Sequence, residues 1–190
     1  MAHYIPFSND TLAILDNVRV SSAFAFNVPA NIPSDVAAPL LCAGTTVFSP
    51  LKHQNVKGGD CVGVIGLGGL GHLAVQFMGA VPVAFSANKC KQILDLGGKK
   101  FYNLSDPDDG EKAANSVNML ILTADAKGMP YNQYLGLLRK RGTLEMLGLP
   151  NDEIKFQPMF VVARGVRVVG SLIGSIEDIE DMLKLVSEKN

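Results

Sequence analysis

The sequence predicts an α/β fold in which a doubly wound parallel sheet follows a short N-terminal segment. From Cys61 onward, short apolar runs alternate with helix-like stretches, as in folds built from strand–helix–strand units. Val117–Leu122 is an unbroken apolar run, which is typical of a central parallel strand covered on both faces. A glycine-rich segment, residues 66–71, lies between the first apolar run and a helix-like stretch. These three observations favour helices on both faces of one parallel sheet.

The individual elements follow from hydrophobic period and turn residues. We expect strands at Cys61–Ile65, Val81–Phe85, 99–102, Val117–Leu122, 143–147 and 166–172. We expect helices at 69–78, 91–96, 131–139 and 176–188, with a short one within 106–115. Before them, residues 32–35 form a turn and helix cap that leads into a helix running to Leu51, and the loose alternation of residues 18–28 predicts a strand or two. Residues 1–17 have too little pattern for an assignment.

The composition excludes several classes of protein. With 190 residues, 47% of them hydrophobic, the chain suits one packed domain. Its net charge of −1, without a basic stripe, argues against a nucleic-acid partner. Cys42, Cys61 and Cys90 form no Cys-x-x-Cys pair and are odd in number. A reducing compartment is therefore expected, and the cytoplasm is the natural one.

One stretch is long enough to cross a membrane, because residues 61–88 contain no charged residue. The same stretch holds six glycines together with His72 and Pro82, and its pattern is that of strand, turn, helix and strand. No basic start followed by an apolar run opens the chain. We therefore expect neither a membrane span nor a secretory signal.

The glycine segment fits Gly-x-Gly-x-x-Gly, and its place between a strand and a helix gives the pattern meaning. Gly66 permits the tight turn, Gly68 lets the backbone approach a pyrophosphate, and Gly71 allows close packing of helix and strand. The helix N-terminus then offers free N–H groups to phosphates. The sequence predicts a Rossmann-type dinucleotide site, and the alternative is a tight turn without a ligand.

The residues after the second strand indicate which dinucleotide is bound. An NAD site carries Asp or Glu about 20 residues past the first glycine, on the ribose 2′-hydroxyl. Ser86, Asn88 and Lys89 occupy that region instead, and they suit a 2′-phosphate. NADP(H) is the expected cofactor. The alternative is that Lys89 and Lys91 are merely solvated, which would leave the choice of cofactor open.

Three longer stretches make the chain similar to the medium-chain zinc alcohol dehydrogenases, and specifically to their cinnamyl alcohol dehydrogenase branch. They are residues 37–51 (AAPLLCAGTTVFSPL), 64–76 (VIGLGGLGHLAVQ) and 170–175 (GSLIGS). The resemblance implies that residues 39–190 form the NADP-binding domain and that residues 1–38 are a remnant of the catalytic domain and a linker. It implies an NADP(H)-dependent oxidoreductase that interconverts primary alcohols and aldehydes.

The resemblance also assigns roles to individual residues. Cys42 corresponds to a ligand of the catalytic zinc, and Thr46 to a contact near the nicotinamide. The further cofactor-binding residues are Gly66, Gly68, Gly69, Leu70, Gly71, Ser86, Asn88, Lys89, Thr123, Gly148, Leu149, Ser171, Leu172 and Ile173. Members of the family form homodimers through the last strand of this domain, here about Val166 to Leu172.

Several departures from the family pattern bear on activity. A catalytic zinc needs about three protein ligands, but the chain has no Gly-His-Glu motif and no four-cysteine lobe, and it ends before the family's return segment. The first helix of the domain is about one turn shorter than in the family. We therefore expect this chain alone to lack zinc-dependent turnover, and a non-catalytic, dimer-forming NADP-binding fragment is the alternative function. A zinc-free reductase is less compatible with Cys42.

The remaining polar residues have simpler interpretations. Cys42 has a second interpretation as a buried core thiol. His72 is expected at the surface or facing the cofactor, and His53 in a solvated loop. The charged side chains of the last helix, Glu177, Asp178, Glu180, Asp181, Lys184, Glu188 and Lys189, are expected to form its solvated face.

Overall fold

A computed structural model of the chain describes residues 21–22, 25–78, 81–85, 90–150 and 153–189. Within these residues, six parallel strands form one sheet in the order β3-β2-β1-β4-β5-β6. The strands are β1 (Cys61–Ile65), β2 (Val81–Phe85), β3 (Lys100–Tyr102), β4 (Val117–Leu122), β5 (Leu138–Met146) and β6 (Arg167–Gly170). This strand order is that of a doubly wound Rossmann sheet, so the predicted fold class is confirmed.

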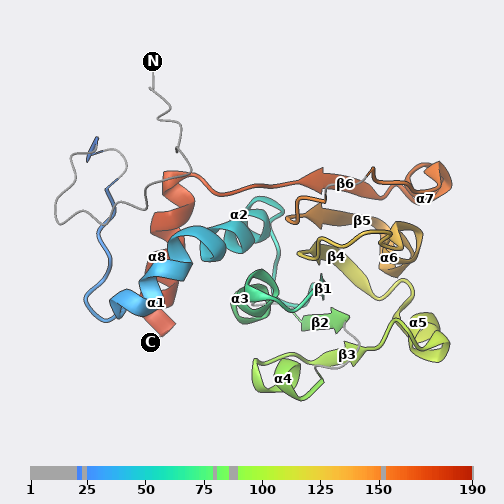
Figure 1. Cartoon of the computed structure of the whole chain (residues 1–190), viewed down its shortest axis with the longest axis horizontal. Coiled ribbons are helices and arrows are strands. Elements are labelled where there is room, and N and C mark those ends of the chain that lie inside the picture. Colours follow the sequence, from blue (N-terminus) through green and yellow to red (C-terminus); the bar gives the residue numbers. More distant parts are fainter. Residues whose placement is uncertain (1–20, 23–24, 79–80, 86–89, 151–152, 190) are drawn as a thin grey trace.

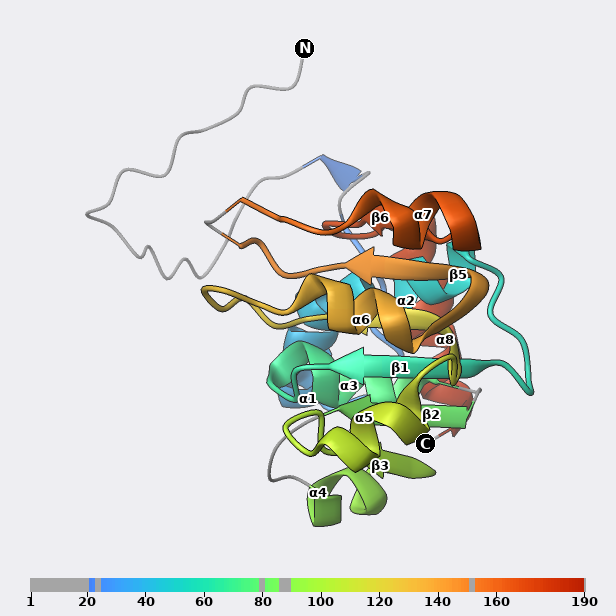
Figure 2. The ribbon, with the colours of Figure 1, turned by 90° about the vertical axis from the view of Figure 1, so that its right-hand side faces the viewer.

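Helices cover both faces of the sheet (Figure 1). The helical segments are α1 (Ser34–Pro39), the π-helical turn η2 (Leu40–Gly44), α2 (Thr45–His53), α3 (Gly69–Phe77), α4 (Cys90–Asp95), α5 (Pro107–Ala113), α6 (Tyr131–Leu137), α7 (Pro158–Arg164) and α8 (Ile176–Lys189). Figure 1 shows α2, α3 and α8 on one side of the sheet and α5, α6 and α7 on the other. Figure 2 shows the strands stacked from β6 at one edge to β3 at the other.

The central strand β4 supplies side chains to two separate cores. Met119 and Ile121 belong to the cluster packed beneath α2 and α3, whereas Leu120 and Leu122 belong to the cluster packed against α6. All four side chains are buried. Because successive side chains of a strand point to opposite faces, this unbroken apolar run is what a strand covered on both faces requires.

The uncharged stretch 61–88, which is long enough to cross a membrane, supplies the strands β1 and β2 and the helix α3 between them. No helix in the described part of the chain is both long and apolar enough to cross a bilayer. The helix α3 ends at Phe77, because Met78 has an extended backbone, and β2 already begins at Val81.

The helix predicted to run to Leu51 is confirmed, with one irregularity. The segments α1, η2 and α2 follow each other without a break to His53. Pro39 stands at the junction of α1 and η2. Proline lacks the N–H of a regular helical bond and clashes with the preceding turn, which accounts for the local change of helix type. The π-helical turn carries Cys42.

Three expectations about the elements are wrong. Residues 25–29 form no strand; Phe26 packs against the helical cluster around α1 and α8 instead. The predicted strand also includes residues 18–20 and 23–24, which lie outside the described residues. The helix expected at 131–139 ends at Leu137, because Leu138 is extended, fully buried, and paired with Val117. The strand β5 therefore begins five residues earlier than predicted and contains an irregularity, with Arg141 at φ 63°.

The helix α7 was not predicted, although its signals are present. Pro158 opens it, and Gly165 ends it at φ 61° in the left-handed region. This is the asymmetry of proline at the start and glycine just past the end that is characteristic of helices. Its first residues lie next to a polar, weakly periodic stretch, and that obscured the pattern.

Candidate functional site

The candidate site lies at the carboxyl ends of the strands, where the strand order reverses. The strand β1 has β2 on one side and β4 on the other, so the loops that follow β1 and β4 diverge at this point. Ligands of open α/β sheets bind at such a switch point. The glycine turn follows β1 here, and Thr123 follows β4.

The glycine turn has the geometry that its sequence predicts. Gly66 has φ 90°, a left-handed conformation that a side chain would strain. A Cβ on Gly71 would lie 1.9 Å from the Gly66 carbonyl oxygen, so only glycine lets the first turn of α3 approach the end of β1 this closely. Gly66 and Gly71 therefore fix the turn, and this role does not depend on a ligand.

Gly68 differs from these two glycines, because a Cβ there would meet no atom within 4 Å. Its φ of −86° is open to any residue, and it is the N-cap of α3. Because Gly68 has no side chain, the space in front of the turn stays open. Gly68 and Gly69 line a cavity of about 480 Å³, together with Pro39, Ala43 and the half-buried His72.

This cavity fits a pyrophosphate on chemical grounds. The helical hydrogen bonds of α3 begin with the His72 N–H, which donates to the Gly68 carbonyl. The N–H groups of Gly69, Leu70 and Gly71 precede it, at the positive end of the helix dipole. Helix N-termini bind phosphates through such groups. His72, expected at the surface or facing the cofactor, is half-buried at this cavity, and its contact with the cofactor stays a prediction.

Thr123 holds the glycine turn from the neighbouring strand. Its hydroxyl donates to the carbonyls of Gly66 at 2.7 Å and Ile65 at 3.0 Å, and its N–H also donates to Ile65. Thr123 was predicted to contact the cofactor. The structure gives it a definite role in shaping the turn, while the cofactor contact stays a prediction.

The predicted nicotinamide-side residues follow the neighbouring strands β5 and β6. Gly148 packs on the chain after β4, since a Cβ there would lie 2.5 Å from the Ala124 carbonyl oxygen. Leu149, Leu172 and Ile173 are large apolar residues that are 69%, 61% and 63% exposed. Ser171 is half-buried, and its N–H donates to the Met146 carbonyl. The carboxyl edge thus presents uncovered apolar side chains beside the glycine turn.

Cys42 is exposed, so the interpretation as a buried core thiol is wrong. Thr46 is 6% exposed, and its hydroxyl donates to the Cys42 carbonyl at 2.8 Å within the helix. In the described part of the chain, no three His, Cys, Asp or Glu residues gather where they could share a metal ion. Cys42 remains a single possible ligand. The candidates for the 2′-phosphate, Ser86, Asn88 and Lys89, lie outside the described residues.

Asp178 corrects the interpretation of the last helix, because it is 0% exposed and does not belong to the solvated face. The side chain of Lys52 lies 3.0 Å from it, and that of Ser49 donates to it at 3.1 Å. The residue is the third in α8 and its carboxylate accepts the Ser175 N–H. Burial raises the pKa of Asp178, but these bonds outweigh it and hold that pKa well below its usual range.

His53 and Lys52 also differ from a plain solvated surface. His53 has a 59% exposed side chain, as expected, but it ends α2 instead of lying in a loop, and its Nε2 lies 3.4 Å from the Asp178 carboxylate. Lys52 lies within 3.3 Å of Glu177, Asp178 and Asp181. These carboxylates, Asp181 foremost, raise the pKa of Lys52 above its ordinary value. The helices α2 and α8 are therefore joined by a polar cluster.

Glu145 is a second buried carboxylate that sequence reasoning missed. It lies on β5, faces α2 and is 2% exposed. Burial raises its pKa, and a hydrogen bond of 3.3 Å from Gln54, with the charges of Arg167 and His53, opposes that rise in part. A charged residue between Leu144 and Met146, within the predicted strand 143–147, was the available signal.

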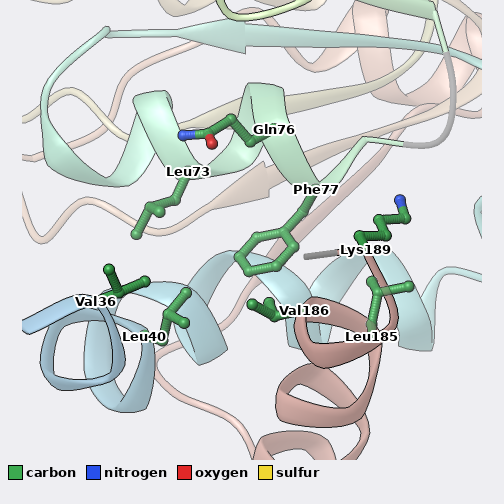
Figure 3. Close-up of a pocket in the computed structure, with 8 residues that line it drawn as sticks. All are labelled: Val36, Leu40, Leu73, Gln76, Phe77, Leu185, Val186 and Lys189. Atoms are coloured by element: carbon green, nitrogen blue, oxygen red, sulfur yellow. The ribbon is translucent and has the colours of Figure 1, made fainter. Parts of the chain in front are cut away.

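A second cavity of about 320 Å³ lies between α3, η2 and α8 (Figure 3), and Leu73 of α3 lines both cavities. Leu40, Leu73, Phe77 and Val186 point into it from η2, α3 and α8, and Lys189 lies at its margin. It is mainly apolar and carries no residue of the glycine turn, so it is distinct from the cavity in front of that turn.

The fold and the glycine turn together define a Rossmann-type domain, and comparison with known proteins identifies its family. The family model described as zinc-binding dehydrogenase matches residues 66–188, well over half of the chain. The chain belongs to the zinc-binding dehydrogenase family, and the resemblance seen in the sequence is confirmed.

Individual relatives agree with this assignment. The NADP-dependent alcohol dehydrogenase C 1 of Mycolicibacterium smegmatis is 39% identical over 176 residues, which cover 90% of this chain and 50% of that protein. A cinnamyl alcohol dehydrogenase structure from Sorghum bicolor aligns with a TM-score of 0.85 and 35% identity, covering 89% of this chain and 50% of that one. The CAD structure from Helicobacter pylori complexed with NADP(H) has a TM-score of 0.72 and 36% identity, covering 84% and 47%. The chain thus spans about half the length of the curated relatives it matches.

Proposed function

We propose that this chain is the NADP(H)-binding part of an oxidoreductase that interconverts primary alcohols and aldehydes. The observation that carries the proposal is the glycine turn: Gly68 leaves open space in front of the N-terminus of α3, beside a cavity of about 480 Å³. The names of the relatives, NADP-dependent alcohol dehydrogenase and CAD complexed with NADP(H), support the cofactor and the substrate class.

The residues of this chain would bind and orient the cofactor. The N–H groups at the start of α3 would bind the pyrophosphate, and Thr123 would keep the turn in place through its bonds to Ile65 and Gly66. The exposed apolar residues Leu149, Leu172 and Ile173 would exclude water beside the nicotinamide. The bound cofactor supplies the hydride acceptor or donor.

A catalytic zinc is not supported by the described residues alone. Cys42 is exposed and could supply one ligand, but three ligands are needed to hold zinc with one open position. We therefore derive no step through a metal. A cofactor-binding, dimer-forming protein without chemistry of its own is the second candidate function, and it is favoured because the described residues bring no second ligand to Cys42. In either case, we propose that residues 39–190 form the cofactor domain.

We propose that two copies pair through β6. Among the described residues this strand has a neighbour, β5, on one side only, and its Val168 is 38% exposed. On α7, which leads into β6, Met159 and Val162 are 68% and 81% exposed. An uncovered edge strand with apolar neighbours favours pairing with its twin across a two-fold axis. We also propose a cytoplasmic location, because Cys42 and Cys61 are free thiols.

The cofactor proposal is tested by titrating the purified chain with NADPH and with NADH, with nicotinamide fluorescence as the signal. We expect NADPH to bind more tightly, because no carboxylate is available near Ser86 to accept the free ribose hydroxyl of NADH. Lys89→Glu should weaken NADPH more than NADH, and Lys91→Glu is the matched control two residues away. Equal or tighter binding of NADH would refute the preference.

The two candidate functions are separated by an aldehyde-reduction assay with NADPH and added zinc, combined with metal analysis of the same sample. We expect cofactor binding without turnover and less than one zinc per chain. Turnover that a chelator abolishes, with about one zinc per chain, would contradict this expectation and identify further ligands.

A further inference from the structure

We propose that Asp178 is a positioning residue that holds the 171–175 loop against α2 and thereby sets the nicotinamide half of the cofactor site. The inference rests on the proposed function, because it assumes that this loop contacts the nicotinamide. It assigns a role to a buried carboxylate that neither the glycine turn nor the cofactor cavity requires.

The Asp178 carboxylate joins three segments at once. One oxygen, Oδ2, accepts the Ser175 N–H at 2.8 Å and the Ser49 hydroxyl at 3.1 Å. The other, Oδ1, lies 3.0 Å from the Lys52 ammonium. The Asp178 N–H in turn donates to the Ser175 hydroxyl at 3.1 Å, which completes a reciprocal cap at the start of α8. The loop end, α8 and α2 are thus fixed by one fully buried side chain.

The same loop packs tightly on α2 immediately before Asp178. A Cβ on Gly174 would lie 2.4 Å from the Thr45 side chain and 2.9 Å from the Asp178 Cβ. Thr45 is buried and next to Thr46, and Gly44 and Thr45 both contact Met182 of α8. Movement of the loop relative to α2 is therefore blocked on both sides of Ser175. Leu172 and Ile173, which the site needs at its apolar edge, are two to three residues away.

The effect of Asp178 on cofactor binding should be confined to the nicotinamide half of the cofactor. The Asp178 cluster lies at the β6 side of the sheet, where the nicotinamide-side residues follow β5 and β6. The glycine turn is held from the end of β4, where the Thr123 hydroxyl bonds the carbonyls of Ile65 and Gly66. Loss of Asp178 should weaken contacts to the nicotinamide ring and leave the phosphates and the adenosine in place.

The test compares two ligands by calorimetry: NADPH, and 2′-phosphoadenosine 5′-diphosphoribose, which is the same molecule without the nicotinamide ring. For Asp178→Asn we expect the Kd of NADPH to rise by roughly tenfold, the effect of losing a hydrogen bond to a charged group, while the Kd of the ring-free ligand changes by less than about twofold. Gly174→Ala keeps the carboxylate but displaces the loop, and should show the same selective loss. Asp181→Asn is the matched control, because it removes another contact of Lys52, at 2.7 Å, without touching Ser175.

Each outcome decides the question. Equal weakening of both ligands by Asp178→Asn would mean that the residue acts only through fold stability, and unchanged binding of both would mean that it positions nothing; either result overturns the inference. If Asp178→Asn does not fold, Ser49→Ala removes one partner of the carboxylate and must give the selective loss at smaller size. A wild-type chain that binds neither ligand overturns the proposed function, and this inference with it.

Discussion

The glycine turn permits a matched pair of substitutions that separates folding from cofactor binding. Gly71→Ala would bring a Cβ to 1.9 Å from the Gly66 carbonyl oxygen, a backbone atom that cannot rotate away. Gly68→Ala would place a Cβ in open space, at a φ of −86° that alanine adopts without strain. The two changes add the same methyl group three residues apart, so their difference isolates what each glycine does.

The expected magnitudes follow from these contacts. Overpacking typically costs about 1–3 kcal/mol, and a fixed backbone contact belongs at the upper end. The better helix propensity of alanine returns about 1 kcal/mol, so Gly71→Ala should lose roughly 2 kcal/mol and melt about 4–8 °C lower. Gly68→Ala should keep or gain stability, by up to about 1 kcal/mol, because alanine restricts the unfolded chain. Its methyl group should nevertheless obstruct the pyrophosphate and raise the Kd of NADPH by about tenfold or more.

Thermal melting by circular dichroism and NADPH titration, performed on both variants and on the wild type, give a melting temperature and a Kd for each protein. Gly136→Ala is a suitable control, since a Cβ there also meets nothing within 4 Å but lies on α6, away from the cavity. A wild-type melting temperature for Gly71→Ala would refute the packing argument. Wild-type NADPH affinity for Gly68→Ala would refute the placement of the pyrophosphate.

Three further predictions concern the buried carboxylates and the edge strand. Glu145→Gln should raise the melting temperature by about 2–4 °C at pH 7, because the raised pKa of Glu145 means that its charged form destabilises the fold. This gain should vanish below the ordinary carboxyl pKa, near 4, because Glu145 is then neutral in the folded and in the unfolded protein. The pKa of Asp178 is lowered, so its charged form stabilises the fold. The stability lost in Asp178→Asn should therefore be greatest at neutral pH and shrink as the pH falls below about 4, and acid-unfolding curves of the two proteins measure it. Val168→Lys should shift a β6-paired dimer toward monomer in sedimentation velocity at micromolar concentration, and an unchanged sedimentation coefficient of the dimer would count against pairing through that edge.

The backbone part of the site could be predicted because single residues determine it. Gly66 and Gly71 are needed wherever a strand turns this sharply into a helix, and the flanking apolar run specified the strand. The strands Cys61–Ile65, Val81–Phe85 and Val117–Leu122 were predicted with their observed bounds. The start of β5 was not, because its first residue follows α6 directly and only tertiary packing makes Leu138 extended.

The buried charges were missed because charge alone was taken as a sign of solvent. Asp178 stands among six other charged residues of α8 in the sequence, although it precedes the buried Met182 by four residues and so lies on the same face of the helix. Ser175 followed by an acid three residues later is, however, a capping signal, and it places that acid against the helix N-terminus. Its complete burial depends on Ser49 and Lys52, more than 120 residues away, which no local pattern reveals.

In the described residues, the groups with shifted pKa values lie away from the glycine turn. The groups with shifted values are Lys52, Tyr131, Tyr134, Glu145 and Asp178. They lie on α2, α6, β5 and α8, in contacts between helices and the sheet, and none of them lines the cavity in front of the glycine turn. Their shifts have structural causes, burial and ion pairs that fix one element against another. In the proposed dehydrogenase, these groups would fix helices against the sheet, and Asp178 would in addition hold the 171–175 loop. Substitutions among them should therefore change cofactor affinity and stability together, with the selective exception proposed for Asp178.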